Sequence, residues 1–424
     1  LPSVGDMKPD WWIVSEVARR MGYGKAFSYQ GPAEIFAEHA ALTEFENSGS
    51  RKLNIGAYAD IDTQTYDDLT PFQWPQRRDV PDDASRLYGD GKFSTPNGKA
   101  QFVAINSCSR PDEAKDEDFT LNTGRIRDQW HTMTRTGKSN RLAAHMAEPF
   151  VEINPADARR LGITDADVVE IANAQGSILV RALLTNRVQV GALFVPMHWT
   201  GDFASAARVD VLVEPIVDPV SGQPALKSSR AHVRLFDAKL YGFAICRDKP
   251  DAIDADYWAR AVCESGWRVE FASAQSFENT ASLARSIVGV SESAPMLAYH
   301  DKDQGQDRFA FFDDDVLIGA VFLSARPVAV SRSWAVGQLS AGYTNSGERY
   351  RVVAGRAGGD QPDRGAIVCA CFSVGVNQIA AAVLSGTCRD IDAVGRLLKA
   401  GTNCGSCRTE IKGIVDAYSV VAAE

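Results

Sequence analysis

The sequence predicts a multidomain chain of mixed fold class, with an α/β portion, a β barrel, a small α+β domain and a C-terminal helical unit. Three observations support this prediction. A length of 424 residues corresponds to two to four domains at about 150 residues each. The pattern of apolar residues changes character several times along the chain, and five of the eight cysteines lie at or after position 369.

The first domain is predicted over residues 1–110. The apolar spacing from Asp10 to Gly22 predicts a helix, and Pro32 is well placed to start a second one. Between 49 and 109 the frequent Pro, Asp and Gly predict long loops around short strands. The first helix can place Trp11, Ile13, Val14, Val17 and Met21 on one apolar face.

The second domain is predicted over residues 111–240 and is rich in short β segments. Residues 150–163 indicate a strand, a turn and a short helix that starts near Pro155. Three further β-rich runs follow between 167 and 199, separated by Gly, Asn or Gln. Several short strands with one small helix favour a closed β barrel over a doubly wound sheet.

The third domain is predicted as a small α+β unit over residues 241–355. Strands are expected at 241–248 and 267–274, helices at 254–266 and 276–289, and a hairpin that turns at Asp313–Asp315. A Gly- and Pro-rich linker then covers 355–365, and residues 366–424 are predicted to be mostly helical.

Charge and cysteine usage narrow the class of protein. A net charge of −9 argues against a nucleic-acid-binding protein, and no apolar run is long enough for a membrane span. Uneven cysteine clustering predicts a metal site in a reducing compartment, which points to the cytoplasm. The scattered Cys108, Cys246 and Cys263 are interpreted as packing residues.

The C-terminal cysteines have an informative spacing. Cys369-x-Cys371 is followed, after 32 residues, by Cys404-x-x-Cys407. Four thiolates are what a [2Fe–2S] cluster requires, two for each iron. A structural zinc site is the alternative, but zinc sites usually use C-x₂₋₄-C pairs, which the tighter first pair does not match. The ligand rules therefore favour iron–sulfur, and Cys388 is interpreted as a packing residue.

Residues 121–142 form a second unusual segment. They are rich in Thr, Gly, Arg, Lys, Trp and His and almost lack aliphatic residues. Arg forks, Thr hydroxyls and Gly amides are natural donors to phosphate groups. The segment is either a phosphate-binding loop or a solvated basic loop, and composition alone leaves both open.

Two resemblances bear on these alternatives. Residues 366–416, with VCACFSVGVNQI and AGTNCGSCRTEI, resemble the bacterioferritin-associated-ferredoxin type of [2Fe–2S] domain. Residues 119–236, with WHTMTRTGK, LFVPMHW and DPVSGQPALK, resemble the C-terminal dinucleotide-binding domain of the DMSO reductase family of molybdopterin oxidoreductases. Within that family the similarity is greatest to the bacterial assimilatory nitrate reductases, and residues 1–23 resemble the end of their preceding molybdenum domain.

The second resemblance implies a double-psi β barrel and bis-molybdopterin guanine dinucleotide with molybdenum as cofactor. Its motifs, carried onto this sequence, imply cofactor contacts at Thr123, Gly124, Arg125, Trp130, His131, Thr132, Thr134, Arg135, Thr136, His198, Trp199 and Lys227. The first resemblance implies that Cys369, Cys371, Cys404 and Cys407 ligate a [2Fe–2S] cluster.

The family also implies a function. It is reduction of nitrate to nitrite by oxygen-atom transfer, with electrons entering through the [2Fe–2S] cluster from a ferredoxin or an NAD(P)H-dependent flavoprotein. No C-x₂-C-x₃-C run for the family's [4Fe–4S] cluster occurs here, so the chain is expected to be the C-terminal part of a longer enzyme. It would then hold no catalytic residues and show no nitrate reduction by itself.

Two other functions stay open. Another molybdopterin oxidoreductase, such as a formate dehydrogenase, would share the dinucleotide-binding segment, because the substrate is selected elsewhere. A non-catalytic electron-transfer module would explain the cysteines alone, but an electron carrier has no need of a phosphate-binding loop.

Overall fold

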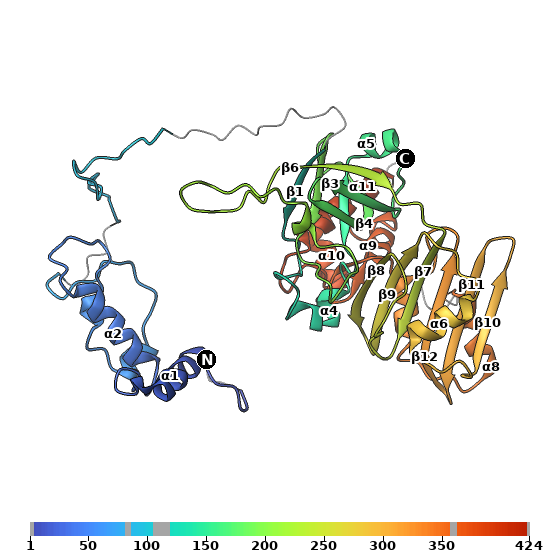
Figure 1. Cartoon of the computed structure of the whole chain (residues 1–424), viewed down its shortest axis with the longest axis horizontal. Coiled ribbons are helices and arrows are strands. Elements are labelled where there is room, and N and C mark those ends of the chain that lie inside the picture. Colours follow the sequence, from blue (N-terminus) through green and yellow to red (C-terminus); the bar gives the residue numbers. More distant parts are fainter. Residues whose placement is uncertain (1–3, 81–85, 105–118, 357–362, 422–424) are drawn as a thin grey trace. The chain divides into compact units, whose positions relative to one another are not determined.

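The computed structural model describes residues 4–80, 86–104, 119–356 and 363–421 (Figure 1). The chain forms two compact units, Leu1–Pro111 and Asp112–Glu424. Cys108 and the boundary expected at 110/111 lie outside the described residues, as does part of the linker expected at 355–365. In the described part of the chain no helix is long and apolar enough to cross a bilayer.

The first unit is helical in its described residues. It contains α1 (Asp10–Ala18), continued by the π-helical turn η1 (Arg19–Tyr23), then α2 (Pro32–Glu44), η2 (Gly56–Tyr58) and α3 (Thr63–Asp67). Both predicted helices are present, and Pro32 occupies the first turn of α2. The short strands expected between 49 and 109 are not found in residues 49–80 and 86–104, where one isolated bridge joins Arg77 and Val80.

The apolar face expected of the first helix is not a core in this unit. Ile13, Val14 and Val17 are about half exposed, and Met21 is 67% exposed. The predicted helix is present, but the spacing of its apolar residues predicts only which residues share a face and not what covers that face.

The second unit begins with a closed six-stranded barrel, which confirms the predicted β barrel. Its strands follow the order β1-β5-β2-β4-β3-β6, and parallel pairing joins β1 to β5 and β2 to β4. The strands are β1 (Phe119–Gly124), β2 (Phe150–Ile153), β3 (Val168–Asn173), β4 (Gly176–Leu184), β5 (Ala192–Pro196) and β6 (Ser229–Leu235). The predicted short helix is α5 (Pro155–Leu161), with Asn154 as its N-cap and Gly162 in the left-handed conformation at its end.

The third predicted domain is a six-stranded antiparallel sheet of order β10-β11-β12-β7-β9-β8. Its strands are β7 (Leu240–Cys246), β8 (Tyr257–Cys263), β9 (Gly266–Ser273), β10 (Met296–Asp301), β11 (Gln306–Asp313) and β12 (Val316–Ser324). The helices are α6 (Thr280–Val288), α7 (Arg332–Gln338) and α8 (Ser346–Ala354). The predicted hairpin is confirmed between β11 and β12, with Asp314 at φ +46° in the turn.

One prediction in this domain is wrong. The segment 254–266, expected to be a helix, forms strand β8 instead. Its buried residues alternate strictly, with Tyr257, Ala259, Ala261 and Cys263 inside. The acidic residues before it suggested a helix start, but the period of two and the aromatic and β-branched side chains decide for a strand.

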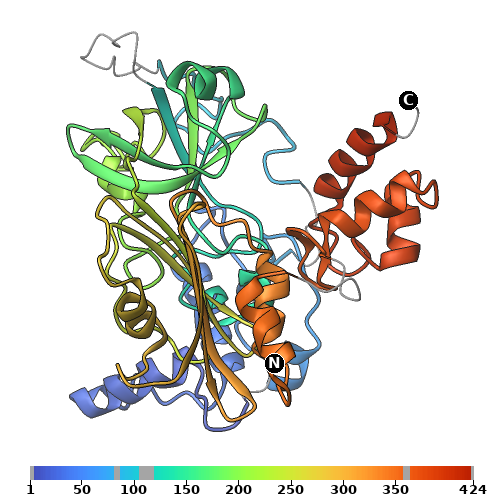
Figure 2. The ribbon, with the colours of Figure 1, turned by 90° about the vertical axis from the view of Figure 1, so that its right-hand side faces the viewer.

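The C-terminal domain is helical, as predicted (Figure 2). A two-stranded ribbon of β13 (Ile367–Cys369) and β14 (Val374–Gly375) precedes α9 (Val376–Leu384), α10 (Ile391–Leu398) and α11 (Arg408–Val421). Its own small core contains Cys388, which confirms the packing interpretation for that residue, along with Ile379, Val394 and Ile411.

Candidate functional site

The donor-rich segment of the sequence is a long loop that leaves the end of β1. It runs from Gly124 through the short turn η3 (Thr136–Lys138) into α4 (Asn140–Ala143). Gln129, Met133 and Gly137 are buried, so every fourth residue anchors the loop on the barrel. Most side chains between these anchors are exposed, namely Trp130, His131, Thr132, Thr134 and Arg135, as is Arg125 before the first anchor.

The anchored loop has an unusual backbone. Asp128, His131 and Met133 adopt positive φ angles of 72°, 44° and 60°. A non-glycine residue in this left-handed region costs about 1–2 kcal/mol, and such costs gather at functional sites. Gly137 is also constrained, because a Cβ there would lie 2.5 Å from Phe203 Cζ. The surrounding fold therefore holds the loop in a fixed, strained shape.

His198 is a main cause of that shape. The residue is fully buried, its Nε2 accepts from the Ile126 N–H at 3.0 Å, and its Nδ1 lies 2.6 Å from the His131 carbonyl. The two contacts fix the tautomer, with the proton on Nδ1, and burial lowers the pKa of the ring. Trp199 beside it is 2% exposed and packs in the barrel core. Both side chains are buried beneath the loop, and their contact with the cofactor stays a prediction.

We expect His198→Ala to destabilise the protein by about 1–3 kcal/mol, because it leaves the Ile126 amide and the His131 carbonyl without their hydrogen-bond partner. His39→Ala, at an exposed position on α2, should stay within about 0.5 kcal/mol. The lowered pKa means that the stabilisation by neutral His198 is present above the unfolded pKa and is lost as the pH falls through the folded pKa. Denaturant unfolding at neutral and acidic pH measures both effects, and equal losses in the two variants would contradict this role.

The remaining predicted contacts lie on or beside the loop. The Thr123 side chain is buried, and among the described residues its Oγ1 has no hydrogen-bond partner. The Lys227 ammonium donates to the Thr123 carbonyl, which brings that lysine to the end of β1. Thr136 Oγ1 donates to Gln129 Oε1 at 2.8 Å, and Thr132 and Thr134 join their hydroxyls at 2.9 Å.

Arg125, Trp130 and His131 form a small exposed cluster on the same loop. The Arg125 guanidinium lies 5.1 Å from the centre of the Trp130 ring, and the His131 ring meets Trp130 edge-on at 4.5 Å. A guanidinium held over an aromatic ring keeps its donors oriented outward. The structure therefore brings cations, hydroxyls and a π surface together on one side of the loop, as a phosphate- and base-bearing ligand requires.

The four C-terminal cysteines gather as two pairs. Cys371 Sγ lies 3.5 Å from Cys404 Sγ, and Cys407 neighbours Cys369. The first pair is the more accessible one, with Cys404 exposed, whereas Cys369 and Cys407 are buried. Burial and the neighbouring Cys369 raise the pKa of Cys407 to about 11, while hydrogen bonds from Ser406 lower the pKa of Cys404. Among the described residues no group of three or more His, Cys, Asp or Glu could hold a single metal ion.

The loop and the cysteine segment touch. Arg127 Nη2 donates to the Val368 carbonyl and to Glu410 Oε2, both at 2.9 Å. Val368 directly precedes Cys369, and Glu410 follows Cys407 in the first turn of α11. The sequence did not predict this contact, because no local pattern links residues that are separated by 241 or by 283 positions.

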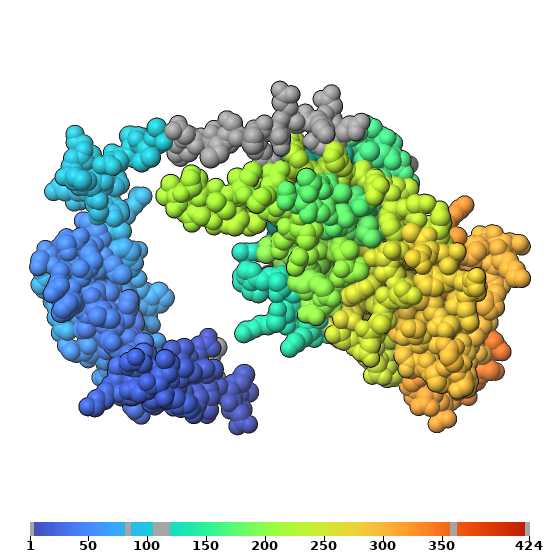
Figure 3. All heavy atoms as spheres, viewed as in Figure 1, coloured from blue at the N-terminus to red at the C-terminus, as the bar shows by residue number. Residues whose placement is uncertain are grey.

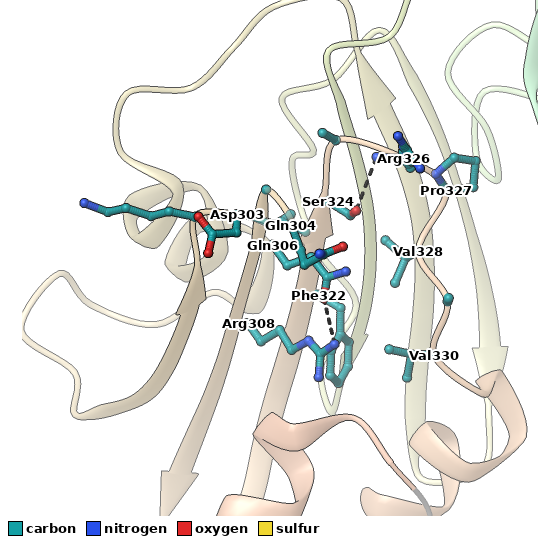
Figure 4. A pocket seen from close by; sticks show the side chains of 15 residues that line it. Asp303, Gln304, Gln306, Arg308, Phe322, Ser324, Arg326, Pro327, Val328 and Val330 are labelled. Carbon is teal, nitrogen blue, oxygen red and sulfur yellow. Dashed lines mark hydrogen bonds between the residues drawn. The ribbon is translucent and has the colours of Figure 1, made fainter.

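A separate pocket of about 660 Å³ lies in the sheet domain, between the β10–β11 turn and residues 324–330 (Figure 4). Its wall includes Phe322, Val328 and Val330, and its inner cation is Arg308. That guanidinium already donates to the Ala354 carbonyl and to Gln306 Oε1. None of the residues predicted from the sequence as site residues lines this pocket.

Comparison with known families identifies the two regions. Residues 119–230 match the family described as molydopterin dinucleotide binding domain. Residues 367–417 match the BFD-like [2Fe–2S] binding domain. The predicted cofactors, a molybdopterin dinucleotide and a [2Fe–2S] cluster, are thereby confirmed for this chain.

Comparison with curated proteins extends over the whole chain. A nitrate reductase of Klebsiella oxytoca is 33% identical over 420 residues, which cover 98% of this chain and 47% of that protein. An assimilatory nitrate reductase catalytic subunit of Bacillus subtilis is 32% identical over 53% of this chain and 30% of its own length. A putative formate dehydrogenase of Bacillus subtilis is 31% identical over 55% of this chain and 22% of its own length. The chain spans about half the length of the first of these relatives, or less of the others.

Proposed function

We propose that this chain, which joins a molydopterin dinucleotide binding domain to a BFD-like [2Fe–2S] binding domain, serves in a molybdenum-dependent nitrate reductase. The observation that carries the proposal is the combination of both cofactor-binding regions in one compact unit of a chain that aligns over 98% of its length with a nitrate reductase. When bound, the molybdenum cofactor supplies the two-electron oxygen-atom transfer that turns nitrate into nitrite and water.

The chemistry of the loop supports the dinucleotide half of the proposal. Thr123 Oγ1, which has no hydrogen-bond partner in the part of the chain that the structure describes, and the Gly124 backbone lie at the end of β1, beside the Lys227 ammonium. These groups would bind one phosphate, and the exposed donors of Arg125 and Arg135 would bind the rest of the anionic ligand. The strained loop backbone would already have its bound shape, so little ordering would be needed on binding.

The arrangement of the thiols supports the cluster half. Two close cysteine pairs fit a cluster in which each iron takes two thiolates, so Cys371 and Cys404 would hold one iron and Cys369 and Cys407 the other. The exposed pair would face the electron donor, for which we propose a ferredoxin or an NAD(P)H-dependent flavoprotein. All seven cysteines in the described part of the chain are free, as expected for a protein of the reducing cytoplasm.

Within this proposal the chain holds cofactors and carries electrons, and it contributes no catalytic residue to nitrate. A formate dehydrogenase is the second candidate, because the formate relative matches over half of the chain at nearly the same identity as the nitrate reductases do. The match over the full chain length favours nitrate.

We expect the holoenzyme that contains this chain, purified with its molybdenum cofactor, to oxidise reduced methyl viologen with nitrate and to form one nitrite for every two electrons. The same preparation should reduce oxidised viologen with formate at background rate only. Formate-dependent reduction without nitrite formation would identify the second candidate as correct. A preparation with full cofactor content and neither activity would refute both functions.

A further inference from the structure

The hydrogen bonds between the dinucleotide-binding loop and the cysteine segment are made by one partly buried arginine. The Arg127 side chain is 17% exposed. It donates hydrogen bonds to two acceptors of the C-terminal domain, the Val368 carbonyl and the Glu410 carboxylate. The first acceptor belongs to the peptide bond that leads into Cys369. The second lies three residues beyond Cys407 on α11.

Two further side chains complete this contact. Asp128 Oδ2 lies 3.3 Å from Arg127 Nη1 and 3.2 Å from His145 Nδ1, as ion-pair contacts that lack the geometry of a hydrogen bond. His145 Nε2 lies 3.4 Å from Glu410 Oε2. Asp128 and His145 are 11% and 13% exposed, so solvent screens these charges poorly. Arg127 and His145 thus both contact one carboxylate of the cysteine-bearing domain, and Asp128 contacts these two in turn.

We propose that Arg127 and Glu410 are positioning residues that dock the [2Fe–2S]-binding domain on the dinucleotide-binding loop and set the reduction potential of the cluster. This inference rests on the proposed cluster site, but not on nitrate as the substrate. It concerns the inner cysteine pair, Cys369 and Cys407, whose chain segments carry the two acceptors of Arg127.

The electrostatic consequence has a definite sign. Reduction adds one negative charge to the cluster, so a fixed cation nearby stabilises the reduced form and raises the potential. Arg127 is that cation, and Glu410 is an anion that opposes it at almost the same place. Removing the arginine should lower the potential, and removing the carboxylate should raise it. A contact that only holds the fold together would shift both variants in the same direction.

The test is a potentiometric EPR titration of the 424-residue chain after its cluster has been rebuilt from iron and sulfide. Arg127→Gln should lower the midpoint potential, Glu410→Gln should raise it, and the double variant should return toward the wild type. Arg127→Lys keeps the charge and loses the planar fork, so its potential should stay near that of the wild type. Arg141→Gln removes one exposed cation close by in the chain and should leave the potential unchanged.

Docking is read separately by limited proteolysis of the linker at 355–365. Arg127→Gln should speed cleavage, whereas Arg127→Lys, which keeps the ion pair with Glu410, and Arg141→Gln should not. Unshifted potentials in the two single charge variants, or shifts of the same sign, would overturn the inference while the cluster site stands. A wild-type chain that assembles no [2Fe–2S] cluster would overturn the cluster site and this inference with it.

Discussion

Glu270→Ala is expected to be among the most destabilising single substitutions in the second unit, with a loss of about 3–5 kcal/mol. Glu270 lies on β9 and is 2% exposed. Arg332 on α7 donates to both carboxylate oxygens of Glu270, at 2.9 and 2.8 Å, and Arg268 donates to one of them at 2.9 Å. Without the carboxylate, the partly buried Arg332 and Arg268 would lose the counter-charge that they share and would repel each other.

The same carboxylate also reaches the barrel. Arg181 on β4 lies 3.8 Å from Glu270 and 2.9 Å from Glu148, which in turn accepts from the Tyr257 hydroxyl at 2.6 Å. The barrel and the sheet domain run into each other without a gap in the space-filling view (Figure 3). Glu270→Ala should therefore destabilise both the barrel and the sheet domain. The two should unfold in one cooperative transition, at a lower denaturant concentration than in the wild type.

Acid should destabilise the wild-type protein through the same Glu270 carboxylate. Burial alone would raise the pKa of Glu270, but Arg332, Arg268 and Arg181 hold that pKa at about 2. A lowered folded pKa means that the stabilisation is complete above the unfolded value near 4 and is lost as the pH falls toward about 2.

Denaturant unfolding of matched variants measures this prediction. Glu170→Ala, which breaks the pair with the exposed Arg234, should cost no more than about 1 kcal/mol. A Glu270→Ala loss no larger than that of Glu170→Ala would contradict the network described above.

Cys369→Ser is expected to have the largest effect on cofactor content, with a fall from about two irons per chain to almost none. The substitution removes a thiolate from the buried pair, where water cannot replace it. Cys388→Ser is the matched control, because Cys388 is equally buried and lies in the same small core but outside the ligand pattern.

Iron analysis with the visible spectrum distinguishes the two variants. The control should keep its iron and its colour, with some loss of stability because a buried hydroxyl replaces a thiol. Equal loss of iron in both variants would mean that the domain merely unfolds, and the ligand assignment would then lack support.

Local patterns in the sequence predicted the elements that depend on local chemistry. The spacing of the four cysteines, Pro at the start of α2 and α5, and the β-rich runs separated by Gly, Asn or Gln each reflect an interaction over a few residues. The prediction of a helix at 254–266 was wrong, because it gave the acidic start more weight than the alternating pattern of the segment.

Features that depend on long-range packing were beyond the sequence. The motif resemblance placed His198 in the cofactor cleft, but only the fold shows that both of its ring nitrogens are used to hold the loop. The contact of Arg127 with Val368 and Glu410 joins three distant segments, and neither Asp128 nor His145 has a motif that would mark it. Positive φ angles at non-glycine residues likewise leave no signal in residue type alone.

The most direct test of the central claim is to count iron and zinc in the anaerobically purified 424-residue chain and to record its visible and EPR spectra. This account predicts about two irons per chain, red-brown absorbance and a rhombic EPR signal that appears on reduction by one electron. A colourless protein with one zinc would contradict it, because the cysteine pairs would then form a structural site and no route for electrons would lead to the dinucleotide-binding loop.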